Sequence, residues 1–583
     1  MNYSENLKSE KIYSASATEI GGINVNGRKG PGNPADLLNF TDKHFPSACV
    51  RPRRAVIRDL ISADCIFGDD TLAWVDSGRL YYGGNEVTGL YLTSGRKKIL
   101  GVGKMLVIFP DLVYYDTASG EYGNMSVTHS AESAYVCCTD SELNEITGYT
   151  VSSKEPENAA VGDYCALTEG ENVTMKRFDG NMWRQCRTFV KISAAGIGAG
   201  INAGDTVECS GLERVFGNAF TVDVSTPSAL YAEGCVANPF YTADISVRRI
   251  VPVFDHVCVS QGRLWGVRRG ADNNGNYICA VYASAPGSPM NFSVSGGGLY
   301  LEINISGSFT GLTDYLGTAV AFTESEIIEL TVKNNDISAL TIRTFGLSEG
   351  CSESVVCDSG VLYYKGTVGV CRYDGSYPEC ISAPIGAVTE KSASGSPAVC
   401  AGGIYYIILA DKCGNSYIYS YNSLRESWQK HDDPGIIAFA KRKENIYAIT
   451  SSDQILLLDY DSAGDDEKTY CCSAGYPSVE SEIGWSFESS EIGSSEFFSK
   501  IPQKAVIRAD FSGTDELTLS IRTDGVISVG PVSLPVPEGK VITVPLKCGK
   551  CDTFSLILGG KGDFRLEGFS VIYRSGGENS VWN

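Results

Sequence analysis

The feature that most constrains the fold is a repeated phrase, in which an apolar strand ends in two tyrosines and a Gly or Asp turn follows. It reads GRLYYGG at 78–84, DLVYYDTASG at 111–120, GVLYYKG at 360–366 and GGIYYIILADKCG at 402–414. The phrases start 33 residues apart in the first pair and 42 apart in the second. Repeats of about 40 residues made of several short strands are typical of propeller blades, which need neighbouring blades to cover their faces. We therefore expect a β-propeller of six to eight blades.

The composition agrees with an all-β protein. Of 583 residues, 64 are Gly and 31 are Tyr, whereas only 6 are Met. Such a chain favours short strands joined by tight turns over long helices. In each tyrosine pair we expect one ring to face a neighbouring sheet and the other to face outward, because side chains alternate along a strand.

The repeat does not run through the whole chain. Turn signals and glycine-rich strands replace it between 120 and 262, and after 478 the strands alternate apolar and polar residues and end at Gly or Asp-Gly. We expect an all-β architecture of five parts. They are an extended N-terminal arm (1–45), the first propeller blades (46–130), an inserted small β domain (131–248), the remaining blades (249–478) and a C-terminal antiparallel β-sandwich (479–583).

Few residues suit catalysis. The 4 histidines stand alone in the sequence, at His44, His129, His256 and His431, and none lies beside a nucleophile motif or a second potential metal ligand. No phosphate-binding loop with a lysine is present, and the acidic pairs lie in turn contexts. We predict that the chain is not an enzyme and needs no cofactor or metal. The sequence alone does not exclude two catalytic carboxylates that face each other across a cleft, as in a glycosidase.

The 20 cysteines are scattered through apolar strands. The polar start MNYSENLKSEK contains no apolar stretch typical of a secretory signal, and no apolar run is long enough for a membrane helix. We expect reduced thiols that act as small core residues in a protein folded in a cytosol. Cys548 and Cys551 have the spacing of a CxxC motif, which leaves a zinc or redox role open.

The charge is unevenly distributed. The net charge is −21, yet residues 1–60 hold nine Lys and Arg against six Asp and Glu, a local charge of +3. The basic residues Arg51, Arg53, Arg54 and Arg58 form the densest group. We predict that this group docks against an acidic protein surface, such as another copy of the chain, with a solvated loop and a DNA contact as alternatives.

Several phrases resemble those of bacteriophage tail proteins. They include CVRPRRAVIRDL from residue 49, LVIFPDLVYYD from 106, VSQGRLWGVRRG from 259 and DTFSLILGGKGDFRLEGFSVIYRSGG from 552. In this order they are similar to the β-propeller proteins of short-tailed phages called packaged-DNA stabilisation or tail nozzle and hub proteins. The resemblance covers about residues 46–575 and is weakest in the insertion at 131–248.

The resemblance implies a structural virion protein of the phage tail. Copies would form a ring, a hexamer by family analogy, below the portal and adaptor. The ring would retain the packaged DNA and line its exit channel during genome ejection. DNA would pass without specific binding, because an acidic wall repels phosphates. Assembly in the host cytoplasm and no contact with a membrane are implied as well.

Two other functions are also consistent with the sequence. Propellers and jelly rolls also bind sugars, and tyrosines supply stacking faces. The chain would then be a receptor- or glycan-binding virion protein, with polysaccharide cleavage as a variant. A cleft with two carboxylates and an aromatic floor would favour this reading over flat lateral surfaces. A cellular scaffold propeller is the third reading.

Overall fold

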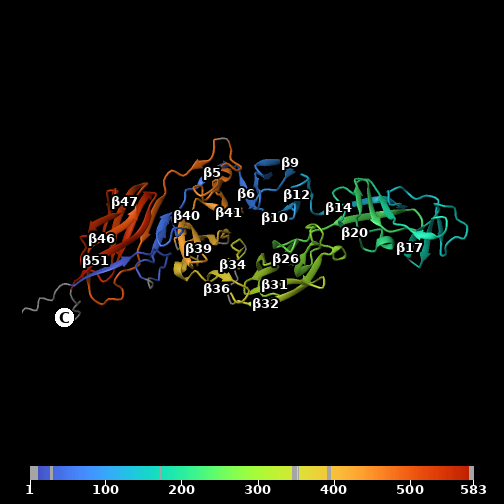
Figure 1. Cartoon of the computed structure of the whole chain (residues 1–583). Helices are drawn as coiled ribbons and strands as arrows, with labels where there is room; N and C mark the ends of the chain where they lie inside the picture. The colour runs from blue at the N-terminus through green and yellow to red at the C-terminus, as the bar shows by residue number, and fades with distance from the viewer. Residues whose placement is uncertain are drawn as a thin grey trace, which may run out of the picture. The chain divides into compact units, whose positions relative to one another are not determined.

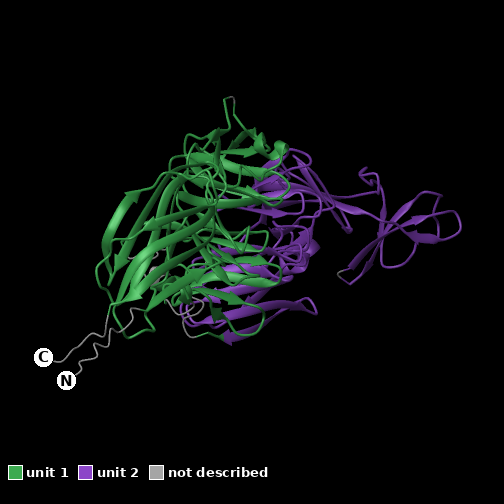
Figure 2. Cartoon of the chain, turned by 60° about the vertical axis from the view of Figure 1, so that its left-hand side comes forward, with its two compact units in different colours: residues 1–96, 343–583 green, residues 97–342 purple. Residues whose placement is uncertain are grey.

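The computed structural model describes residues 11–26, 30–170, 172–344, 351, 353–389, 395–411, 413–473 and 475–576. The first ten residues of the expected arm and the last seven of the expected sandwich lie outside these ranges. The chain folds into two compact units, one of residues 1–96 and 343–583 and the other of residues 97–342 (Figure 2). No helix in the described part is long and apolar enough to cross a membrane.

The fold is all-β, as predicted, and contains a β-propeller, an inserted β domain and a C-terminal β-sandwich (Figure 1). The described residues form seven blade sheets, each with four consecutive antiparallel strands except the last. Such meandering sheets follow from strands of two to nine residues joined by tight turns, where Gly supplies a positive φ, as at Gly78.

Four blade sheets belong to the first unit. Their strands are β6 (Ala63–Gly68), β7 (Leu72–Asp76), β8 (Arg79–Tyr82) and β9 (Asn85–Tyr91); β33 (Val356–Asp358), β34 (Val361–Gly366), β35 (Gly369–Tyr373) and β36 (Glu379–Cys380); β37 (Ala398–Ala401), β38 (Ile404–Ala410), β39 (Ser416–Asn422) and β40 (Ser427–Asp432); and β41 (Ile436–Arg442), β42 (Asn445–Thr450) and β43 (Gln454–Leu457). The last sheet is completed by β5 (Ala55–Asp59), which pairs with β43, and by β44 (Ser478–Val479). A strand from near the N-terminus thus closes a blade formed 400 residues later.

Three blade sheets belong to the second unit. Their strands are β10 (Lys98–Val102), β11 (Met105–Phe109), β12 (Val113–Asp116) and β13 (Tyr122–Asn124); β25 (His256–Ser260), β26 (Arg263–Ala271), β27 (Tyr277–Ala283) and β28 (Leu299–Glu302); and β29 (Phe309–Tyr315), β30 (Thr318–Thr323), β31 (Glu326–Lys333) and β32 (Asp336–Arg343). The sheet of β25–β28 contacts both of the others.

The inserted domain interrupts this second unit. Its larger sheet contains β14 (Val127–Thr139), β19 (Phe189–Ser193), β20 (Thr206–Ser210), β21 (Ala219–Thr221), β22 (Val224–Thr226), β23 (Ala229–Glu233) and β24 (Phe240–Arg249). Its smaller sheet contains β15 (Thr150–Ser152), β16 (Tyr164–Glu169), β17 (Asn172–Phe178) and β18 (Trp183–Gln185). The chain enters through β14 and leaves through β24, which pair along most of their length. The domain spans 127–249, against the expected 131–248, and in Figure 1 β14, β17 and β20 lie together, away from β26 and β31.

Arg249 fastens the insertion to the blade that precedes it. Arg249 is 2% exposed, and its guanidinium forms an ion pair with Asp205 of the insertion and donates to the carbonyls of Asn124 (2.9 Å) and Met125 (2.9 Å). A buried cation is tolerable only when its donors are satisfied, so this arrangement fixes the entry and the exit of the insertion at one point.

The sandwich has two sheets. One contains β1 (Ile12–Ala17), β3 (Phe40–Thr41), β4 (Ala48–Val50), β46 (Lys500–Asp510), β49 (Val541–Pro545) and β51 (Arg565–Ser575). The other contains β2 (Asp36–Leu38), β45 (Gly484–Glu488), β47 (Thr514–Thr523), β48 (Val526–Ser533) and β50 (Phe554–Gly562). Four short helical segments complete the described elements. They are the α-helical turns α1 (Glu213–Phe216) and α2 (Asp465–Lys468) and the 3-10 segments η1 (Val294–Gly296) and η2 (Ala383–Thr389).

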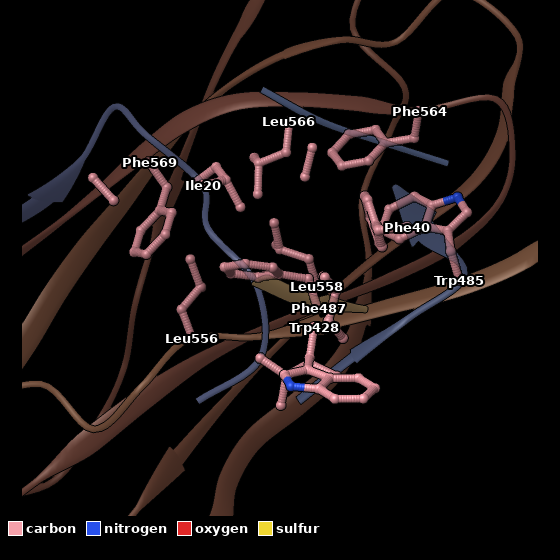
Figure 3. Close-up of a cluster of buried hydrophobic side chains, with 14 of the residues drawn as sticks. Ile20, Phe40, Trp428, Trp485, Phe487, Leu556, Leu558, Phe564, Leu566 and Phe569 are labelled. Carbon is pink, nitrogen blue, oxygen red and sulfur yellow. The ribbon is translucent and has the colours of Figure 1, made fainter. Parts of the chain in front are cut away.

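The N-terminal segment is not the extended arm that the sequence suggested. β1 pairs with β51 over six residues, from Ile12 opposite Arg574 to Ala17 opposite Phe569. Phe40 is fully buried in the sandwich core, edge-on to Trp485 at 5.6 Å, and Trp485 stacks on Phe564 at 4.2 Å (Figure 3). The described part of residues 11–45 is therefore integral to the sandwich, because its apolar residues complete the core that the C-terminal strands leave open.

Candidate functional site

Of the four arginines singled out from the sequence, Arg51, Arg53 and Arg54 lie on the link between the sandwich strand β4 and the blade strand β5, and Arg58 lies in β5. Arg51 is 5% exposed and binds Glu480 with two parallel hydrogen bonds, Nη1 to Oε2 and Nη2 to Oε1, both 2.8 Å long. Its Nη2 also donates to Asp432 Oδ1 at 2.9 Å, and its Nε to Asn39 Oδ1 at 3.1 Å. This fork geometry satisfies the guanidinium within the chain.

Arg54 lies beside Arg51 and shares its acidic partner. Its Nη2 donates to the main-chain oxygen of Asp432 at 2.7 Å, and its Nη1 lies 3.3 Å from Asp432 Oδ2. Burial and the nearby Arg51 lower the pKa of Arg54 to about 10. Burial opposes ionisation of Asp432, but Arg54 and Arg51 outweigh it and hold its pKa below the usual value. The cluster is therefore fully ionised near neutral pH.

The other two arginines also have partners within the chain. Arg53 is exposed, and its Nη2 and Nε bind Asp461 Oδ1 at 2.7 and 3.0 Å. The guanidinium of Arg58 lies over the Trp74 ring, 5.0 Å from its centroid. The predicted docking role of Arg51 and Arg54 is corrected by this geometry, since buried, paired guanidiniums offer nothing to another protein. Their acidic partners, Asp432 and Glu480, lie about 380 and 430 positions later in the sequence. The net charge of residues 1–60 therefore does not include them.

A cavity of about 600 Å³ lies next to this cluster, between the sheets of β37–β40 and β41–β43. Its lining includes the apolar Ile404, Ile418 and Ile446 and the buried polar Ser420 and His431. His431 Nε2 lies 3.1 Å from Ser420 Oγ, an arrangement that the sequence did not reveal because the two residues sit on adjacent strands.

This Ser–His pair has the wrong electrostatics for a catalytic base. Burial, followed by Arg51 and Arg54, lowers the pKa of His431 to about 3, whereas a general base works best with a pKa near the operating pH. Among the residues that the structure describes, the Nδ1 atom has no hydrogen-bond partner, so none of them orients the ring as the third residue of a catalytic triad does. We interpret the pair as a structural contact within the blade.

No group of three or more His, Cys, Asp or Glu residues that could hold a metal occurs in the part of the chain that the structure describes. In the CxxC segment, Cys551 is buried, and burial raises the pKa of its thiol to about 12. A redox-active cysteine reacts as a thiolate, so Cys551 does not suit a redox role at neutral pH.

One edge of the sandwich exposes apolar side chains. β48 and β49 are consecutive in the chain, and each is the last strand of its sheet. We call the exposed residues on and between them the sandwich-edge patch: Val526 (69% exposed), Ile527 (48%), Val532 (44%), Val536 (38%) and Val541 (49%). Between 526 and 547 the sequence holds only Glu538, Lys540 and Lys547 as charged residues, a net charge of +1 on a chain of −21.

The structure defines an all-β protein that combines a propeller with an inserted domain and a sandwich. No protein-family model matches the chain, and no curated protein does.

Among solved structures, the chain is similar to BamB from Moraxella catarrhalis, at 9% identity and a TM-score of 0.30, covering 70% of this chain and 95% of BamB. It is similar to an exo-β-1,3-galactanase from Phanerochaete chrysosporium, at 12% identity and a TM-score of 0.18, covering 76% and 99%. It is also similar to PorZ of the type-IX secretion system of Porphyromonas gingivalis, at 12% identity and a TM-score of 0.22, covering 82% and 70%.

Proposed function

We propose that the chain is a structural subunit of a bacteriophage tail, which assembles with copies of itself into a ring below the portal and adaptor. The ring would retain the packaged DNA and line its exit channel. The phrases that resemble tail nozzle and hub proteins support this role, and so does the propeller-and-sandwich architecture in which those phrases lie.

The sandwich-edge patch is the observation that carries the proposal. Two copies of a chain with a net charge of −21 repel each other unless they meet where charge is low. The patch is nearly neutral and its exposed side chains are apolar, which is the character of surface that marks interaction sites. A stable interface buries about 800 Å² per partner, so we take the patch as the centre of a larger contact.

The contact would use side chains rather than an extended β-ladder. Open strand edges invite pairing with other strands, but Pro531 in β48 has no N–H to donate. The pairing of β48 with β47 is also irregular, with register shifts near Ile521. Packing of Val526 and Ile527 against a neighbouring copy fits both features, and a contact between different surfaces of two copies can close into a ring.

The remaining parts of the proposal follow from the same role. The partners are further copies of the chain, the portal or adaptor and other tail proteins, and DNA passes without specific binding. The protein would be located in the virion tail after assembly in the host cytoplasm. It would work without a substrate or a cofactor.

The proposal is tested by the mass of the purified protein in solution, measured by light scattering and imaged by negative-stain electron microscopy. We expect the wild type to form rings and Val526→Asp/Ile527→Asp to stay monomeric, because two buried charges oppose the contact. Val161→Asp is the control, since Val161 is 75% exposed on the inserted domain. A wild type that stays monomeric, alone and with portal or tail proteins, or a double variant that still forms rings, would refute the proposal.

A further inference from the structure

The second unit contains a groove of about 340 Å³ beside the sheet of β25–β28, where the inserted domain joins the blades. Its floor is aromatic and apolar, and its rim is polar. The floor residues are Met290, Phe292, Tyr282 and Tyr300, and the rim residues include Glu208, Arg248, Asp272 and Asn274. None of these residues takes part in the sandwich-edge patch.

The aromatic floor is held in place by packing. The rings of Tyr282 and Tyr300 lie 5.0 Å apart at 51°, on adjacent strands β27 and β28. The ring of Phe254 packs against both Tyr282 and Phe292, with its centroid 5.9 Å and 5.4 Å from theirs. Tyr300 donates its hydroxyl hydrogen to Glu302 at 2.6 Å and keeps 38% of its surface exposed. The groove therefore presents a fixed tyrosine whose position is set before any ligand arrives.

The rim supplies hydrogen-bonding groups at fixed positions. Glu208 and Arg248 face each other on β20 and β24, form an ion pair of 2.8 Å and are both 48% exposed. Asp272 Oδ1 accepts from the amides of Asn274 (2.9 Å) and Asn276 (2.7 Å), which fixes its carboxylate. A carboxylate and a guanidinium each keep free hydrogen-bonding capacity after such contacts. Donors and acceptors thus stand side by side above an aromatic floor.

This combination matches the chemistry of a sugar. One face of a pyranose carries C–H groups that pack on an aromatic ring, and its edge carries hydroxyls that both donate and accept. Two arginines and two carboxylates line the groove. Arg248 is paired with Glu208, and the buried Arg249 is paired with Asp205, which leaves the Asp272 carboxylate without a cationic partner in the lining, so an anionic ligand would be repelled. Ligand pockets range from about 300 to 1,000 Å³, and this groove lies at the lower end, the size for one or two sugar units.

We propose that this groove binds a neutral saccharide, with the sugar face on Tyr300 and its hydroxyls on Glu208 and Arg248. Binding here does not depend on ring formation, because the groove lies within the second unit. A glycan-binding role, open from the sequence, is therefore compatible with a structural subunit and needs no cleavage of the glycan.

The test is binding of the full-length protein to an array of neutral and acidic oligosaccharides, followed by calorimetric titration with the strongest neutral binder. We expect Tyr300→Ala to weaken binding at least tenfold and Arg248→Ala by a similar factor. Tyr300→Phe keeps the ring and should stay within about threefold of the wild type. Tyr277→Ala is the matched control, since Tyr277 is 72% exposed on β27 but does not line the groove.

Folding of each variant is checked by its thermal midpoint, which should not change for exposed positions. Absence of binding to every neutral oligosaccharide, or binding that Tyr300→Ala leaves intact, would overturn the proposal. Binding to acidic glycans alone would also overturn it, because the rim charge excludes them. Ring formation is measured separately, so either proposal can fail without the other.

Discussion

Lowering the pH from 7 to 5 should destabilise the blade of β37–β40 through His431. This histidine is 6% exposed, and the charged groups around it are Arg51, Arg54 and Asp432. Burial and the two guanidiniums oppose a positive imidazole, while the Asp432 carboxylate favours it more weakly. The native protein therefore keeps His431 neutral, with a pKa of about 3, whereas an unfolded chain protonates it near pH 6.5.

The size of the effect follows from proton linkage. Between pH 6.5 and 3 the unfolded state holds one more proton on this residue, so stability falls as the pH falls, by up to about 1.4 kcal/mol per unit. From pH 7 to pH 5 the loss is about 2 kcal/mol. The lowered pKa values of Asp432 and Glu480 act in the same direction, but only near and below pH 4.5, where unfolded carboxylates take up protons.

The assay is urea unfolding followed by tryptophan fluorescence, to which the buried Trp428 on the same strand contributes. The loss of stability from pH 7 to pH 5 should be about 2 kcal/mol smaller in His431→Gln than in the wild type. His44→Gln, at an exposed position, should behave like the wild type. The pKa of His256 is lowered too, by burial, but it contributes equally to all three proteins. Equal pH dependence in wild type and His431→Gln would refute the reasoning.

Two further predictions concern buried arginines. Arg51→Met should lower the free energy of unfolding in urea by about 2–3 kcal/mol, which is less than for a fully buried ion pair because the Asp432 side chain is 45% exposed. Arg53→Met, at an exposed ion pair, should lower it by at most about 1 kcal/mol. Equal losses in the two variants would contradict the conclusion that Arg51 is a buried structural residue. Arg249→Met removes the guanidinium that pairs with Asp205 and donates to two carbonyls, so hydrogen exchange should accelerate in residues 127–249 and stay unchanged in β25–β28. Uniform acceleration across the unit would argue against a local fastening.

The strand phrases located the blades because their signal is local. GRLYYGG and DLVYYDTASG contain β8 and β12, each the third strand of its sheet, while GVLYYKG and GGIYYIILADKCG contain β34 and β38, each the second. The spacing within each pair thus measures one blade. The expected split of each tyrosine pair was only partly met: Tyr363 and Tyr364 are both buried, at 5% and 0% exposure. Neighbouring elements cover both faces of that strand, so alternation no longer separates a wet side from a dry one.

The prediction of an extended N-terminal arm is wrong because the strands that pair with this segment are remote in the sequence. IYSASA at 12–17 alternates weakly, and only β51, more than 500 residues later, turns it into a strand. Phe40 lies among glycines, prolines and acidic residues, which favours an irregular segment until Trp485 and Phe564 are placed around it. The groove at Tyr300 was equally hidden, since its rim residues Glu208 and Arg248 belong to the inserted domain. Pairings of this kind depend on tertiary contacts that no local pattern encodes.

The arginine cluster shows how the topology uses the basic charge of the N-terminal region. The chain runs from the sandwich into the blades after β4 and returns from the blades to the sandwich after β44, so two connections pass between them. Arg51 binds Glu480, which directly follows β44, and so joins the outgoing connection to the returning one. Arg53 binds Asp461, which lies between β43 and β44. These ion pairs hold together a blade sheet that is completed by β5 from the far end of the sequence. Because these arginines are paired within the chain, they do not offset the repulsion between the acidic surfaces of two copies. A self-assembling form of the chain therefore needs a contact where the surface charge is low, and the sandwich-edge patch is nearly neutral.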